Sequence, residues 1–227
     1  MKIAAALCWF DEPPETLRRC VSSLAGVADV VVALDGRWKV YPGPANISLL
    51  EQAEAIHEAA AAIGIPVVDE SCRATQPWPS QIEKRAALMR LAAEHGHWTF
   101  VVDADEYVAE ASSVELRAAL QDTACDVAEV AIAATGRGVF DARPHPRRRI
   151  YRSSAAVGLE RGHNGYRAAD GRWLNGDPRH VDLDPAANLS DVVRLIHDRE
   201  GRSPARLANA DAYYRLRPKI EEEWAAA

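Results

Sequence analysis

Short apolar runs alternate with longer amphipathic segments along the first hundred residues, and this alternation constrains the fold more than any other feature. Four runs are short and continuous, as in buried parallel strands: 2–8, 29–34, 65–68 and 98–102. Three segments between them carry apolar residues at helical spacing: 13–26, 47–63 and 80–95. This order predicts an α/β fold with a mostly parallel central sheet and helices on both faces.

The second half of the chain is less regular. It predicts a helix near 113–120, strands near 127–133 and 148–152, and loops with short strands over 153–200. Ser203 and Pro204 are expected to begin a final helix, because serine caps helices and proline suits their first turn. A length of 227 residues fits one large α/β domain.

Charge and composition exclude several classes of protein. The 27 basic and 33 acidic side chains give a net charge of −6, which argues against a general nucleic-acid binder. No apolar run approaches the roughly 20 residues that cross a bilayer, and the N-terminus does not have the pattern of a signal peptide. The four cysteines are scattered, so they are expected to be reduced thiols in a cytoplasmic protein: Cys8, Cys20, Cys72 and Cys125.

Arginines are concentrated in one segment of the second half. Nine arginines and three acidic residues lie between Arg143 and Arg179, which gives this segment a charge of +6 and the rest of the chain −12. Two interpretations remain open. The segment is either a solvated loop region or a cationic wall over an anionic ligand, since the planar guanidinium group suits phosphates.

Acidic residues follow three of the predicted strands. They are Asp11 and Glu12, Asp35, and the pair Asp103 and Asp105. Ligands of open α/β sheets bind beyond the carboxyl ends of the strands, so these clusters predict a site at one edge. Two carboxylates one residue apart also suit a hard divalent cation that keeps positions for phosphate oxygens.

Four motifs follow one another in the first half of the chain. They are a strand followed by Trp9-Phe10-Asp11-Glu12, a strand followed by Asp35-Gly36, a helix with Gln81-x-x-Lys84-Arg85, and a strand followed by Asp103-x-Asp105. In this order they resemble the nucleotide-binding half of the family 2 GT-A glycosyltransferases. The resemblance implies a GT-A-like domain in which residues 1–108 bind a nucleoside diphosphate sugar. Residues 109–227 would then bind the acceptor and include the C-terminal helix.

The resemblance also implies roles for individual residues. The donor nucleotide would contact the first two loops, the helix and the DxD motif: Trp9, Asp11, Glu12, Asp35, Lys84, Arg85 and Asp103. Mn²⁺ or Mg²⁺ would be bound by Asp103, Asp105 and a late histidine, His197. Arg202, which follows this histidine, is placed with the donor-binding residues. His163 is expected on the acceptor side, either as a hydrogen-bonding residue or as a general base, and Asp105 as its catalytic counterpart at the metal.

The function that follows is metal-dependent transfer of a sugar from a nucleoside diphosphate donor, with a UDP donor favoured. The acceptor, whether glycan, protein or small molecule, is left open, as are the donor sugar and the stereochemistry. No GxGxxG, GxxxxGK[ST] or GxSxG motif is present, which disfavours dehydrogenases, P-loop enzymes and hydrolases of the corresponding types. A non-catalytic module that binds sugar nucleotide or glycan, and a sugar nucleotidyltransferase, remain as alternatives.

Overall fold

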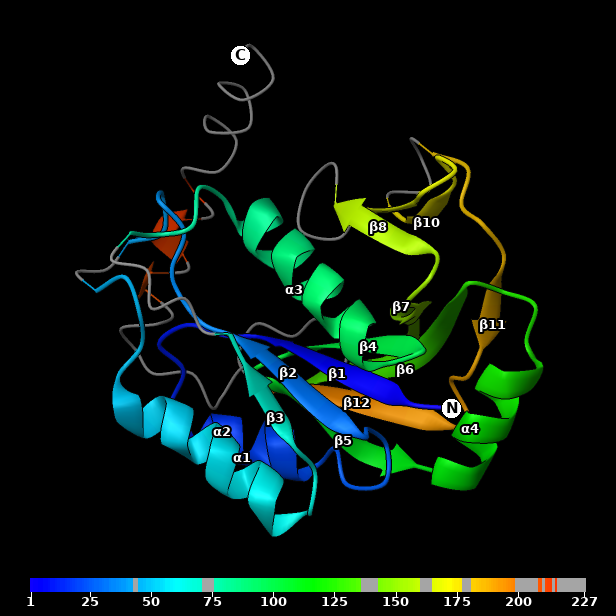
Figure 1. The fold of residues 1–227 in the computed structure, drawn as a ribbon, viewed down its shortest axis with the longest axis horizontal. Coiled ribbons are helices and arrows are strands. Elements are labelled where there is room, and N and C mark those ends of the chain that lie inside the picture. Colours follow the sequence, from blue (N-terminus) through cyan, green and yellow to red (C-terminus); the bar gives the residue numbers. More distant parts are fainter. Residues whose placement is uncertain are drawn as a thin grey trace.

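A computed structural model describes residues 1–42, 45–70, 76–135, 143–159, 165–176, 181–198, 208–209, 211–213 and 215. Within these ranges the central element is a nine-stranded sheet of order β3-β2-β1-β4-β7-β6-β12-β5, with β11 beside β6 (Figure 1). Its strands are β1 (Ile3–Cys8), β2 (Val30–Leu34), β3 (Val67–Asp69), β4 (Trp98–Asp103), β5 (Glu106–Ala111), β6 (Val127–Thr135), β7 (His145–Arg152), β11 (Ala186–Asn188) and β12 (Val193–Asp198).

Helices cover both faces of this sheet. On one face lie α1 (Pro14–Ser22) and α2 (Leu50–Ala62), and on the other lies α3 (Gln81–His95) (Figure 1). A fourth helix, α4 (Ser113–Asp122), contributes its buried leucines to the same core as α1 and α2. A small antiparallel sheet, formed by β8 (Ala156–Leu159), β9 (Tyr166–Ala168) and β10 (Trp173–Asn175), packs against α3.

The side chains of β1 show how the sequence makes two cores. Because successive residues of a strand point to opposite faces, Ile3, Ala5 and Leu7 pack against α1 and α2. Ala4 and Ala6 face α3 and pack with its Leu88 and Ala92. All five β1 side chains are fully buried, as expected of a central parallel strand.

The α/β class is confirmed, with a mostly parallel sheet and helices on both faces. Strands β3, β2, β1 and β4 run parallel to one another, and β7 and β5 are antiparallel additions. The sequence did not indicate β5, since its residues alternate between polar and apolar and several are exposed.

Two helix boundaries differ from those predicted. Helix α1 ends at Ser22 rather than at Gly26, and α2 begins at Leu50 rather than at Ile47. The second difference has a physical reason: the backbone N–H and the hydroxyl of Ser48 are bonded to Asp35, so the segment before α2 is fixed as a loop. The start predicted at Ser203 and Pro204 lies outside the described residues. Residues 208–209, 211–213 and 215 are helical.

Three of the cysteines can be assigned. Cys8, Cys20 and Cys125 are free thiols, and Cys72 lies outside the described residues. Among the helices in the described part of the chain, none is long and apolar enough to span a bilayer.

Candidate functional site

The carboxyl ends of three parallel strands meet at one edge of the sheet. Cys8, the last residue of β1, pairs with Leu34 of β2 on one side and with Asp103 of β4 on the other. Neighbouring strands lie about 4.8 Å apart, so the segments that follow them are close together. The acidic residues after these strands therefore share one edge, as the sequence predicts.

Asp103 is held by two arginines. Arg85, from α3, donates to its Oδ1, and the Nη2 atom of Arg149, from β7, lies 3.4 Å from its Oδ2. Burial alone would raise the pKa of Asp103, but the two guanidinium groups hold it well below its ordinary range. Asp103 is therefore an ionised carboxylate with a positively charged partner on each oxygen.

Glu106 lies beneath the same turn and is almost completely buried. Its Oε2 accepts a hydrogen bond of 3.0 Å from the backbone N–H of Asp103, and its Oε1 is bonded to Arg149. Burial raises the pKa of Glu106 to about 7, and the neighbouring Asp103 adds to this rise while Arg149 opposes it. Glu106 thus fixes the backbone of the DxD turn from the protein side.

Asp105 is paired with His197. The two side chains come from the turn after β4 and from β12, and Nε2 of His197 lies 2.9 Å from Oδ2 of Asp105. Burial lowers the pKa of His197, but its hydrogen bond to Asp105 and the surrounding carboxylates leave it raised. The backbone N–H of Asp198 also donates to the carbonyl of Asp105, at 2.8 Å.

These contacts bring together two of the three predicted metal ligands. Adjacent ligands of an octahedral cation bound at about 2.1 Å lie about 3 Å apart, close to the spacing of the Asp105 and His197 atoms. Asp103 does not join them, because its oxygens are bonded to arginines. Among the described residues, no three His, Cys, Asp or Glu side chains are grouped as a metal site. Asp105 and His197 form a hydrogen-bonded pair in this structure, and a cation bound by both would take the place of the shared proton.

Asp35 organises the loop that follows β2. Its carboxylate accepts hydrogen bonds of 2.7 Å from both the backbone N–H and the hydroxyl of Ser48. The same hydroxyl accepts a 2.8 Å bond from the backbone N–H of Asp11, a residue with a φ of 53°. Ser48 thus joins its own segment to Asp11 in the loop after β1 and to Asp35 in the loop after β2.

Trp9 and Glu12 are buried at this edge. Trp9 continues the alternation of β1, so its ring lies in the core against α1 and α2 and is only 2% exposed. The predicted contact of Trp9 with the donor is therefore not offered by an exposed ring in this structure. Glu12 is also buried, and its carbonyl accepts a bond from the side-chain amide of Gln52.

Phe10 lies on the opposite side from Trp9 and joins an aromatic cluster with Trp38, Tyr41 and Tyr213. The rings of Trp38 and Tyr41 have centroids 4.5 Å apart, and Tyr213 packs edge-on against Trp38 at 5.5 Å. Tyr213 belongs to the helical residues near the C-terminus, so this part of the chain packs beside the loop that follows β2.

Lys84 and Arg85 lie next to each other on α3, and neither is a solvated helix charge. Arg85 reaches Asp103, as described above. Lys84 is fully buried, and its ammonium group donates to the carbonyl oxygens of Trp9 and Gly36 at 2.5 and 2.7 Å.

Several arginines of the arginine-rich segment pair with carboxylates of the protein itself. Arg148 contacts Glu129, Arg152 contacts Asp126, and Arg172 contacts Asp170, Asp126 and Asp184. Arg149 reaches the DxD turn, and the sequence did not single it out from its neighbours. His163 and Arg202 lie outside the described residues, so their roles stay predictions.

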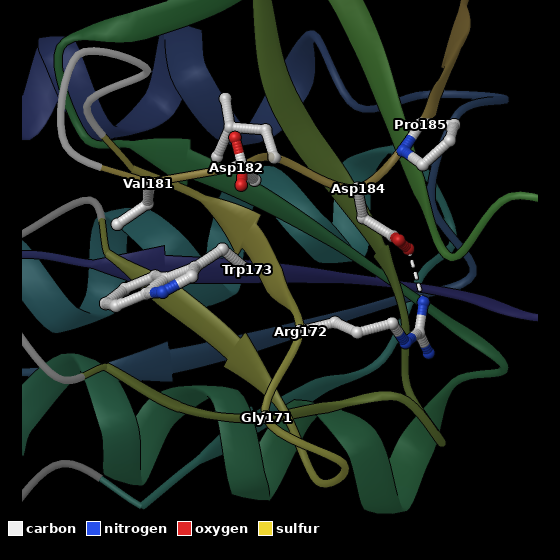
Figure 2. A pocket seen from close by; sticks show the side chains of 8 residues that line it. Gly171, Arg172, Trp173, Val181, Asp182, Asp184 and Pro185 are labelled. Atoms are coloured by element: carbon white, nitrogen blue, oxygen red, sulfur yellow. Dashed lines mark hydrogen bonds and ion pairs between the residues drawn. The ribbon is translucent and has the colours of Figure 1, made fainter.

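A hollow of about 510 Å³ lies apart from these residues, beside β10. Figure 2 shows Trp173 below Val181 and Asp182, with the ion pair between Arg172 and Asp184 to the right. Residues 171–173 and 181–185 line it, and none of them comes from the loops after β1, β2 or β4.

No protein-family model matches the chain, and no curated protein matches it. Among solved structures, it is similar to S. aureus TarS residues 1–349, with 16% identity, a TM-score of 0.48, and coverage of 68% of this chain and 48% of that chain. The aligned part thus spans about half of the TarS fragment.

Structures with bound ligands are among the similar ones. TarS 1–349 in complex with UDP-GlcNAc has 16% identity and a TM-score of 0.46, over 68% of this chain and 46% of that chain. Glucosyl-3-phosphoglycerate synthase from Mycobacterium tuberculosis, in complex with Mn²⁺, UDP and glucosyl-3-phosphoglycerate, has 15% identity and a TM-score of 0.40, over 71% and 61%. These alignments cover 68% to 71% of this chain.

Proposed function

We propose that this protein is a glycosyltransferase that moves a sugar from a nucleoside diphosphate donor to an acceptor, with the help of Mn²⁺ or Mg²⁺. Residues 1–108 would bind the donor, and residues 109–227 would provide most of the acceptor side. The sequence resemblance favours a UDP donor. The acceptor would be a glycan, a protein or a small molecule, and screening of these three classes would identify it.

One observation carries this proposal: Asp105 and His197 meet at the carboxyl edge of the sheet, beside Asp103 and two arginines. The carboxylate oxygen of Asp105 and the ring nitrogen of His197 are the kinds of ligand atom that divalent cations bind. The guanidinium groups of Arg85 and Arg149 place positive charge at the same turn. This combination suits a diphosphate better than a neutral ligand.

The chemistry follows from where charge develops during transfer. When the bond between sugar and diphosphate breaks, negative charge accumulates on the leaving diphosphate. A cation bound by Asp105 and His197 would supply Lewis-acid stabilisation of that charge. Arg85 and Arg149 are already fixed by Asp103 and Glu106, so their positive charge needs no reorganisation during the reaction. Asp103 would hold these arginines and contact the donor ribose.

His163 remains our candidate on the acceptor side. It lies in the sequence Gly162-His163-Asn164-Gly165, where glycines allow close approach of a ligand and the side chains offer hydrogen-bond donors and acceptors. As a general base it would contribute about 10²–10⁴ in rate, and as a positioning residue less. His163→Ala is expected to retain donor binding in either case.

The test is an assay of UDP release from UDP-glucose, UDP-GlcNAc and other sugar nucleotides, with and without Mn²⁺. We expect slow Mn²⁺-dependent hydrolysis of at least one donor, which an acceptor accelerates. Asp105→Ala should abolish it, whereas the exposed Glu110→Gln on β5 should not. Binding without turnover would instead identify a non-catalytic module, and exchange of pyrophosphate into the donor would identify a nucleotidyltransferase.

A further inference from the structure

Lys84 is a fully buried charged side chain at the site edge. Its exposed fraction is 0%, although it lies on α3 next to residues that face solvent, such as Glu83. Its ammonium group donates to the carbonyl of Trp9 at 2.5 Å and to the carbonyl of Gly36 at 2.7 Å. Hydrogen bonds from a charged donor are stronger than neutral ones, and burial strengthens them further.

The two carbonyls belong to different loops. Trp9 begins the loop after β1, and Gly36 lies in the loop after β2, 48 residues from Lys84 in the sequence. These are the two loops that carry Asp11, Glu12 and Asp35. A single buried ammonium group therefore joins the loops on which the proposed donor site is built.

The loop after β2 is also held from the segment that leads into α3. The indole N–H of Trp78 donates to the carbonyl of Asp35 at 3.0 Å. Gly36 has a φ of +107°, and a Cβ atom there would lie 3.0 Å from Nε1 of Trp78. Only glycine fits this position without strain, and its carbonyl is thereby presented to Lys84.

We infer that Lys84 is a positioning residue, which sets the spacing of the loops after β1 and β2 through the carbonyls of Trp9 and Gly36. It acts through these loops and not by contact with the nucleotide. An effect of Lys84 on donor affinity rests on the proposed function, whereas its effect on the two loops is independent of that function.

The first experiment therefore uses no ligand. Lys84→Met removes the ammonium group but keeps an unbranched side chain with good helix propensity. Hydrogen exchange is measured at the amide of Asp11, which is bonded to Ser48, at the amide of Arg37, which is bonded to Asn46, and at Phe100 in β4. We expect exchange in both loops to accelerate about ten-fold or more while Phe100 is unchanged. Unchanged exchange in the two loops would overturn the inference.

A matched control is available on the same helix. Arg90 is exposed on α3, so Arg90→Met removes a positive charge without touching either loop and is expected to leave their exchange unchanged. If Lys84→Met does not fold, exchange in the wild-type protein decides instead. The amides of Asp11 and Arg37 should then open with one shared free energy, and clearly different values would contradict a common bridge.

The second experiment measures UDP affinity in the presence of Mn²⁺, and turnover of the active donor. Lys84→Met is expected to weaken binding and raise KM about ten-fold, with a smaller change in kcat. Lys84→Arg, which keeps a cationic donor, should recover part of the affinity. Failure of the wild-type protein to bind any nucleotide would refute the proposed function, whereas the exchange experiment would still decide whether Lys84 joins the loops. Wild-type affinity in Lys84→Met would refute the positioning role.

Discussion

Nε2 of His197 lies 2.9 Å from Oδ2 of Asp105, although 92 residues separate the two in the sequence. Strand β12 makes this contact, because it pairs with β6 on one side and with β5 on the other. His197 stands opposite Glu106 in the pairing with β5, so it lies directly beside the DxD turn. The second half of the chain thus completes a site that begins in the first.

Arg149 is expected to be the largest single contributor to the stability of this turn. Its partner Glu106 has a completely buried side chain, so removing the guanidinium group leaves a carboxyl group in the core without its cation. Arg149→Met should lower the free energy of unfolding by about 3 to 5 kcal/mol. Urea denaturation followed by circular dichroism measures this loss.

The neighbouring Arg147 provides the control, since it is exposed on the same strand. Arg147→Met should change the free energy of unfolding by about 0.5 kcal/mol or less. Glu106→Gln should cost less in the Arg149→Met background than in the wild type, because both substitutions remove the same contact. Purely additive losses in the double variant would show that the two side chains are not coupled.

The sequence predicts the first half of the fold well, because each element there is locally determined. Continuous β-branched runs such as 29–34 indicate central strands, and Ser80 caps α3 through a bond to the N–H of Glu83, as its position at the start of the amphipathic segment suggests. The acidic residues at strand ends meet because parallel strands of one sheet share an edge.

The contacts within the site could not be predicted from the sequence in the same way. Arg149 is one of nine arginines in its segment, and only the pairing of β7 with β4 and β6 shows that it reaches Asp103. Lys84 has the neighbours of an ordinary helix charge, and its burial follows from how α3 packs over two loops. Trp9 was predicted to contact the donor, although strand alternation continued by one residue places its ring in the core.

Acid titration is expected to weaken a contact far from the site. The carboxylate of Asp29 accepts bonds from the backbone N–H of Ile3 at 2.7 Å and from Arg117. Burial alone would raise the pKa of Asp29, but these bonds leave it below its ordinary value. The contact therefore stabilises the fold above the pKa of the unfolded chain, about 4, and this stabilisation is lost as pH falls through the lower folded value.

Asp29→Asn should accordingly destabilise the protein by about 1 kcal/mol at pH 7, a modest value because the ion pair is partly exposed. The difference between wild type and variant should shrink as pH falls from about 5 to 3. Denaturation at a series of pH values measures it. A difference that stays constant over this range would contradict the assigned role of the carboxylate.

Gly96 is expected to resist substitution because the chain passes very close to it. A Cβ atom at this position would lie 2.7 Å from the backbone nitrogen of Ala4 and 2.8 Å from the carbonyl oxygen of Trp98. Gly96→Ala should therefore cost about 2 to 3 kcal/mol, as backbone atoms of β1 and β4 must shift.

Gly64 provides a comparison with Gly96, because substitution there is expected to destabilise the protein for a different reason. Its Cβ would meet nothing within 4 Å, but its φ is +74°. Gly64→Ala should cost about 1 kcal/mol from backbone strain alone. Equal losses at the two glycines, measured by thermal unfolding, would show that the close approach at Gly96 is not the dominant effect.

The central claim is that Asp105 and His197 bind a cation that helps to hold a nucleoside diphosphate. Calorimetric titration of UDP into the wild-type protein and into Asp105→Ala, with and without Mn²⁺, tests it most directly. We expect Mn²⁺ to tighten UDP binding to the wild type by about ten-fold or more, and to have no effect on a folded Asp105→Ala variant. Wild-type binding that is indifferent to Mn²⁺, or unchanged Mn²⁺-dependent binding in the variant, would contradict the account.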